Sequence, residues 1–71
     1  MRTRRDKMTM SAIVERFTVD GKRYGITVKG EIYSLMRDSR GRERIAYHIT
    51  DETSYSHIWN QFRFQAIQEL A

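Results

Sequence analysis

The chain contains no cysteine and no proline. The missing thiols exclude a disulfide framework, a zinc–thiolate site and a cysteine nucleophile. No stretch approaches the ~20 consecutive apolar residues that a membrane-spanning helix requires. No apolar segment follows the basic residues near the N-terminus, as it would in a signal peptide. These absences together lead us to expect a cytoplasmic protein with no membrane partner.

What is present indicates one small folded domain. The chain has 71 residues, 39% hydrophobic and 31% charged, including one Trp, four Tyr and three Phe. This balance is typical of a folded chain rather than a disordered one, and the length lies near the lower limit for independent folding. Large aromatic rings each bury much surface, which a small core needs.

The net charge of +4 is unevenly distributed. Residues 1–10 hold four basic side chains and one acidic side chain, whereas residues 11–71 hold nine basic and eight acidic ones. We therefore predict a flexible basic N-terminal arm over residues 1–10 and a single domain over residues 11–71.

The first two predicted strands alternate apolar and polar residues. Their apolar positions are Ile13, Phe17 and Val19, then Tyr24, Ile26 and Val28. Asp20-Gly21 between them is typical of a two-residue type I′ turn, in which both central residues have positive φ. That turn would place Phe17 opposite Tyr24 and Ile13 opposite Val28, so that both apolar sets share one face.

Two further strands are predicted up to Ile49. A two-residue turn at Lys29-Gly30 would join the second strand to the third, and a loop over residues 39–41, with Gly41 in the left-handed conformation, would join the third to the fourth. The expected pairs across these connections are Ile26 with Tyr33, Leu35 with Ile45, and Tyr33 with Tyr47.

After Ile49 the period changes. Residues 50–54 are rich in residue types that cap a helix N-terminus. Apolar residues then recur at helical spacing, at Tyr55, Ile58, Trp59, Phe62, Ala66 and Leu70. The sequence therefore predicts an α+β fold: a four-stranded antiparallel sheet, a ββββ meander, with one C-terminal amphipathic helix packed on one face.

The predicted register also defines the opposite face of the sheet. That face would be open to solvent and would carry arginines but no carboxylate, around an apolar centre. The candidate interface residues there are Val14, Arg16, Arg23, Ile32, Met36 and Arg44.

The sequence contains no recognisable catalytic or metal-binding motif. His48 and His57 are the only histidines, and their spacing matches no metal motif. No serine or threonine lies in a nucleophile elbow or phosphate loop. We also expect the sheet to be too small to enclose a substrate pocket. The sequence predicts a protein that is not an enzyme and has no cofactor, metal or small-molecule substrate.

Two binding functions remain. In the first, the acid-free face contacts a protein partner or a second copy of the chain, as an inhibitor, adaptor or homodimer would, because arginines around apolar side chains are common at protein interfaces. In the alternative, the same face and the arm bind nucleic-acid phosphates. The candidate phosphate contacts are Arg2, Arg4, Arg5, Arg40 and Arg42.

Overall fold

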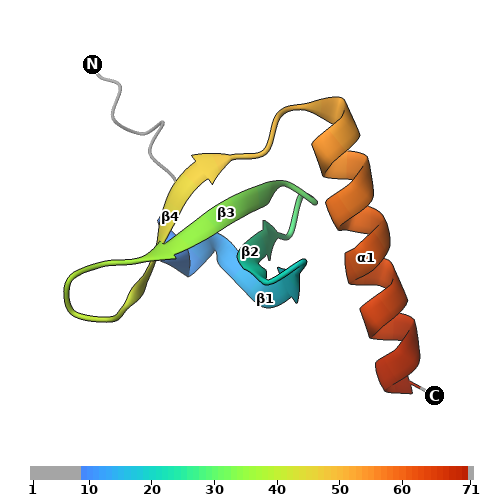
Figure 1. Ribbon diagram of the computed structural model, residues 1–71, viewed down its shortest axis with the longest axis horizontal. Coiled ribbons are helices and arrows are strands. Elements are labelled where there is room, and N and C mark those ends of the chain that lie inside the picture. The colour runs from blue at the N-terminus through green and yellow to red at the C-terminus, as the bar shows by residue number, and fades with distance from the viewer. Residues whose placement is uncertain (1–8, 71) are drawn as a thin grey trace.

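The computed structural model describes residues 9–70 and confirms the predicted α+β fold. Four antiparallel strands lie in the order β1-β2-β3-β4, and one helix follows them (Figure 1). The elements are a 3-10 turn, η2 (Met10–Ala12), then β1 (Ile13–Val19), β2 (Lys22–Thr27), β3 (Ile32–Arg37), β4 (Glu43–His48) and α1 (Glu52–Leu70). Within the described residues, no helix is long and apolar enough to cross a membrane.

The β1–β2 hairpin has the predicted turn. Asp20 and Gly21 both have positive φ, 54° and 80°, and Phe17 lies opposite Tyr24. The prediction for Ile13 is wrong, because a bulge between Ile13 and Glu15 places Ile13 opposite Thr27 rather than Val28. One extra residue in a strand reverses the face of every residue beyond it. Ile13 therefore lies on the face away from the helix.

The β2–β3 connection is one residue longer than predicted. The Thr27 amide donates to the Glu31 carbonyl, and the Gly30 amide, at φ 87°, donates to the Thr27 carbonyl. Ile26 consequently lies opposite Ile32 and not opposite Tyr33. This shift sends Ile32 to the helix side of the sheet and Tyr33 to the other side. Val28 is left in the loop, 85% exposed.

The β3–β4 hairpin combines a correct turn with an unforeseen bulge. Gly41 has the predicted left-handed conformation, φ 80°, and Leu35 lies opposite Ile45 as expected. Beyond that pair the register shifts by one residue, so Tyr47 lies opposite Ser34 rather than Tyr33. Tyr47 therefore shares the helix side of the sheet with Tyr24.

The main core lies between the sheet and α1. Its buried members are Phe17, Val19, Tyr24, Ile26, Ile32, Ile49 and Ile58, with Tyr55, Trp59 and Phe62 packed against them. The Asp51 carboxylate accepts a hydrogen bond from the Ser54 amide at 2.8 Å, which caps the first turn of the helix. The rings of Phe17 and Phe62 lie 4.7 Å apart and hold α1 against β1.

The opposite face is not the open surface that the sequence predicts. Tyr33 and Leu35 lie on it and are buried, only 7% and 8% exposed. Ile13 covers Gly25 there, and η2 lies against β4. This side of the sheet therefore has an apolar layer of its own. On α1, by contrast, Phe64 and Ile67 remain exposed.

Candidate functional site

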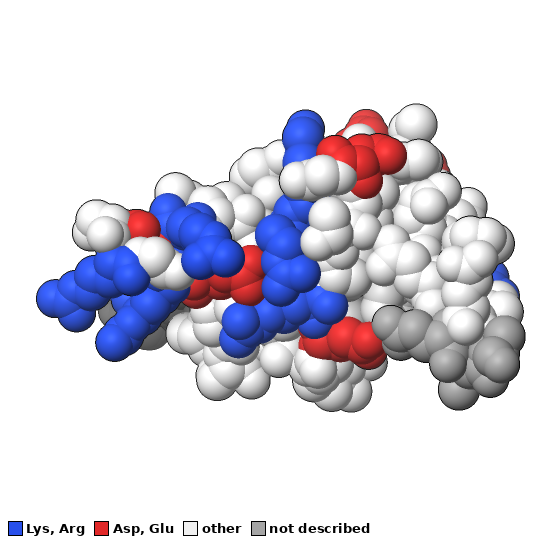
Figure 2. Space-filling model, turned by 60° about the horizontal axis from the view of Figure 1, so that its bottom comes forward, with Lys and Arg blue, Asp and Glu red and all other residues white. Residues whose placement is uncertain are grey.

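Five arginines make one surface on the side of the sheet away from α1. We call this set the basic surface: Arg16, Arg23, Arg37, Arg40 and Arg42. They come from β1, β2, the end of β3 and the β3–β4 loop, and that loop projects away from the helix (Figure 1). Figure 2 shows Lys and Arg side chains gathered over the hairpin and the adjoining strands, with acidic side chains between them, while the surface farther from the hairpin is mostly uncharged.

Two shallow hollows connect these side chains. Arg16, Arg37 and Arg42 line one, of about 440 Å³. Lys22, Arg23 and Arg37 line the second, also about 440 Å³, which we call the Arg23 hollow. Since Arg37 borders both, the guanidinium groups form one continuous arrangement.

Glu43 lies within this arrangement, so the prediction of an acid-free face is wrong. Arg23 donates to the Glu43 carboxylate through Nε at 2.8 Å and through Nη2 at 3.3 Å, and Arg16 donates to it at 3.1 Å. The hydrogen bond from Arg23 is the main cause that holds the pKa of Glu43 below its usual value, and it also raises the pKa of Arg23. Glu43 thus stays ionised and orients two arginines toward the surface. The longer β2–β3 connection explains the error, because it exchanges the faces of β3 and so brings Arg37 and its partner Glu43 to this side.

Asp38 organises the projecting loop. Its carboxylate accepts hydrogen bonds from the backbone amides of Arg40 and Arg42, at 2.9 and 3.0 Å, and from Nε of Arg44 at 2.9 Å. The bond from Arg44 is the largest of the causes that lower the pKa of Asp38. Arg37 closes the loop by donating to the Gly41 carbonyl at 2.8 Å. The side chains of Arg40 and Arg42 are exposed and bond to no other group in residues 9–70.

The structure separates the predicted interface residues. Val14 lies exposed at the β1 bulge, whereas Ile32 is completely buried, at 0% exposure, in the main core. Met36 is exposed, but it lies opposite Arg44 on the reverse side of the hairpin. The predicted apolar centre therefore does not form, although Arg16 and Arg23 do lie together as expected.

Other predicted contacts have mixed outcomes. Arg40 and Arg42 lie on the basic surface, while Arg2, Arg4 and Arg5 fall outside the described residues. Arg37 was missed by the sequence analysis. Its position opposite Glu43, three residues before Arg40, could have identified it from the predicted hairpin turn.

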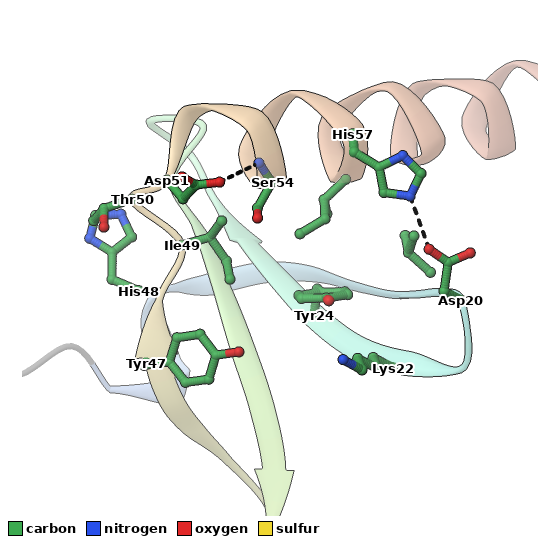
Figure 3. A pocket seen from close by; sticks show the side chains of 12 residues that line it. Asp20, Lys22, Tyr24, Tyr47, His48, Ile49, Thr50, Asp51, Ser54 and His57 are labelled. Carbon is green, nitrogen blue, oxygen red and sulfur yellow. Dashed lines mark hydrogen bonds and ion pairs between the residues drawn. The ribbon is translucent and has the colours of Figure 1, made fainter.

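A second feature lies on the helix side of the sheet, between the start of α1, the end of β4 and the β1–β2 turn (Figure 3). We call this open groove, of about 410 Å³, the tyrosine groove. Its apolar wall includes Val19, Ile49 and Ile58, and its polar wall includes Lys22 and His57. In Figure 3, Tyr47 of β4 points toward Tyr24 of β2 across the groove.

Two contacts shape the rim of the tyrosine groove. His57 Nε2 lies 2.9 Å from the Asp20 carboxylate, which joins α1 to the β1–β2 turn (Figure 3). Burial is the main cause that raises the pKa of Tyr24, and its nearness to Tyr47 adds to the shift. At ordinary pH the Tyr24 phenol is therefore neutral and can donate or accept hydrogen bonds.

Residues 9–70 contain no group of three or more His, Asp or Glu side chains placed to hold a metal ion. Comparisons with protein families, with curated proteins and with solved structures find no match to this chain. Function must therefore be argued from the basic surface and the tyrosine groove alone.

Proposed function

We propose that this protein binds nucleic acid by contacting phosphate groups with its basic surface. The observation that carries the proposal is the convergence of four arginines of the basic surface on two adjoining hollows, both of which Glu43 also lines. Arginine presents a planar fork of donors that matches phosphate oxygens, and phosphate contacts supply most of the affinity in sequence-independent binding.

The loop arginines are suited to the first contact with a polyanion. Arg40 and Arg42 lie at the tip of a projecting hairpin, and the bonds from Asp38 hold the backbone beneath them. Because that backbone is already ordered, little conformational entropy remains to be lost there when a ligand binds. Arg16 and Arg23 are similarly held by Glu43 and keep further donors for phosphate.

The proposal is tested by titrating the protein into labelled oligonucleotides over a range of salt concentrations. The wild-type affinity is expected to fall steeply as salt rises, because each neutralised phosphate releases condensed counterions. The double variant Arg40→Ala/Arg42→Ala should bind more weakly and should lower the salt slope by about two, one for each lost phosphate contact.

A matched control removes two positive charges elsewhere. Lys29 lies in the β2–β3 loop and Arg63 on α1, and neither lines the hollows of the basic surface. The variant Lys29→Ala/Arg63→Ala has the same net charge as the test variant and should retain nearly wild-type affinity and slope. If both variants lose the same affinity, the loss depends on net charge and not on the position of Arg40 and Arg42. Absence of binding at low salt would contradict the proposal.

Binding without catalysis and a cytoplasmic location, which the lack of cysteine favours, form part of the same proposal. In this view the protein acts by occupying or covering a nucleic acid. The absence of a recognisable nucleophile or metal motif in the sequence supports this part of the proposal.

A protein partner is the second candidate, and a different surface favours it. Phe64 and Ile67 are 55% and 59% exposed and lie three residues apart, on one side of α1. If α1 joins two copies, sedimentation should detect a dimer that Phe64→Ser dissociates. The matched control is Val28→Ser, which removes an exposed apolar side chain from a loop instead. A monomeric wild type would exclude self-association through this helix.

A further inference from the structure

A small residue lies in the sheet between the two tyrosines of the tyrosine groove. Tyr24 lies opposite Ser34 in the β2–β3 pair, and Ser34 lies opposite Tyr47 in the β3–β4 pair. The three side chains therefore form one row across the sheet. Since Ser34 is much shorter than a tyrosine, the row is low in its middle and high at both ends. Figure 3 shows Tyr24 and Tyr47 at those two ends.

The two tyrosines differ in how much ring they offer to a ligand. Tyr24 is 8% exposed and belongs to the main core, whereas Tyr47 is 61% exposed. The helix packs mainly against β1, and Tyr47 on β4 stays exposed. An exposed aromatic ring at the edge of a groove is a platform on which a flat ring can stack, and stacking on a nucleic-acid base does not depend on the base's identity.

The tyrosine groove continues into the basic surface. Lys22 and Tyr47 line both the tyrosine groove and the Arg23 hollow. Arg23 and Arg37 also line that hollow, together with Glu43, whose carboxylate accepts the hydrogen bond from Arg23. A ligand that places a ring against Tyr47 therefore finds cations next to it, beginning with Lys22 and continuing to Arg23.

The carboxylates of the tyrosine groove already have partners, which reduces their repulsion of an anion. Asp20 is 2.9 Å from His57, and Asp51 accepts the hydrogen bond from the Ser54 amide. Asp51 also lies at the N-terminus of α1, where the helix dipole offsets its charge. The tyrosine groove thus places the Lys22 ammonium and the Tyr47 ring beside two carboxylates that already accept hydrogen bonds or lie against a histidine.

We infer that the tyrosine groove receives one unpaired base of a single-stranded nucleic acid, stacked on Tyr47, while the flanking phosphates contact Lys22 and Arg23. The volume of about 410 Å³ is large enough for one nucleoside. This inference rests on the proposed function and narrows it, since a duplex keeps its bases stacked inside and cannot use the groove.

The test compares a labelled single-stranded oligonucleotide of mixed sequence with the duplex of the same sequence. Wild type should bind the single strand more tightly. Tyr47→Ala should weaken single-strand binding about tenfold or more, because loss of one base–aromatic stack typically costs that much. Tyr47→Phe keeps the ring and should bind nearly as wild type does, and duplex affinity should not change in either variant.

Phe64→Ala is the matched control, because Phe64 is an aromatic residue of similar exposure, 55%, that lines neither the groove nor the hollow. It should leave single-strand affinity unchanged. Thermal unfolding of each variant checks the fold, and both exposed rings should be removable without a large change in the melting temperature.

The outcomes separate the two proposals. No binding to either nucleic acid at low salt overturns both. Salt-dependent binding in which the duplex is preferred, or in which Tyr47→Ala has no effect on the single strand, overturns the inference about the groove and leaves phosphate binding by the basic surface intact. A loss for Tyr47→Phe as large as that for Tyr47→Ala would also overturn stacking, because the ring is still present.

Discussion

Ile13 covers Gly25 so closely that a Cβ atom at position 25 would lie 2.7 Å from Ile13 Cγ2. The contact lies on the face away from α1 and arises from the bulge that moves Ile13 opposite Thr27. Gly25 has an ordinary strand conformation, so a glycine is needed here because a larger side chain would clash with Ile13 and not because of backbone strain. The absent side chain gives Ile13 a place on the sheet.

The first prediction follows from this contact. Gly25→Ala should lower the free energy of unfolding by about 1–3 kcal/mol, because overpacking forces Ile13 to move. Adding Ile13→Ala should remove most of the extra cost, so the double variant should be less destabilised than the sum of the single variants. Urea unfolding of the three variants measures the coupling.

Gly21→Ala provides the contrast. Gly21 has φ 80°, and nothing lies within 4 Å of its added Cβ. The substitution should cost about 1–2 kcal/mol through backbone strain alone, and Ile13→Ala should not relieve it. If the coupling with Ile13 is the same at both glycines, the contact between Ile13 and Gly25 does not explain the first result.

A second prediction tests the register of β3. Ile32 is completely buried and Val28 is 85% exposed. Ile32→Val should cost about 0.5–1.5 kcal/mol and Ile32→Ala about 2–5 kcal/mol. Val28→Ala should change the free energy of unfolding by less than about 0.5 kcal/mol. The register predicted from the sequence implies the reverse order, so chemical denaturation of these variants distinguishes the two.

The third prediction concerns acid. Hydrogen bonds lower the pKa of Glu43, mainly through Arg23, and the pKa of Asp51, mainly through the Ser54 amide. A carboxyl whose pKa is lower in the folded state stabilises the fold above its unfolded pKa, and that contribution is lost as pH falls through the folded value. The melting temperature should therefore decline as the pH falls below the ordinary pKa values of the two groups, 4.5 for Glu43 and 3.8 for Asp51. Glu43→Gln should be less stable than wild type at neutral pH and should show a smaller decline in acid.

A fourth prediction links Glu43 to binding. Glu43→Gln removes the carboxylate that Arg16 and Arg23 both bind and releases these two arginines from it. The affinity for nucleic acid should rise severalfold at low salt and less at higher salt, where exposed charges are screened. Anisotropy titration measures this change, and Glu52→Gln, at the start of α1, is the control of equal charge. If the affinity of Glu52→Gln rises as much, the effect comes from net charge and not from the position of Glu43 beside Arg16 and Arg23.

The predictions that are confirmed are those of features determined by residues close together in the chain. Asp20-Gly21 predicted a type I′ turn, and both residues have positive φ. The change of period after Ile49 predicted the single helix. These features depend on residues close together in the chain, where turn geometry and helical spacing leave few alternatives.

The face of a strand is predicted wrongly where alternating apolar residues are the only guide. In β3, Tyr33 and Leu35 alternate with Ile32 and Met36, so both faces of the strand carry apolar residues. The larger pair was expected in the main core, yet Ile32 lies there and Tyr33 faces the other way. A loop one residue longer than expected reverses the whole strand, and no local signal distinguished the two loops.

The linear pattern of residues thus determined the order of strands and helix. It also determined two of the three hairpin turns and the apolar stripe of α1. The tertiary structure decided which residues meet across the sheet: Glu43 with Arg16 and Arg23, Ile13 with Gly25, and Tyr24 with Tyr47 on either side of Ser34. Bulges and loop lengths determine these contacts, because one added residue exchanges the two faces of a strand. Packing of the whole sheet, rather than any short segment, selects among them.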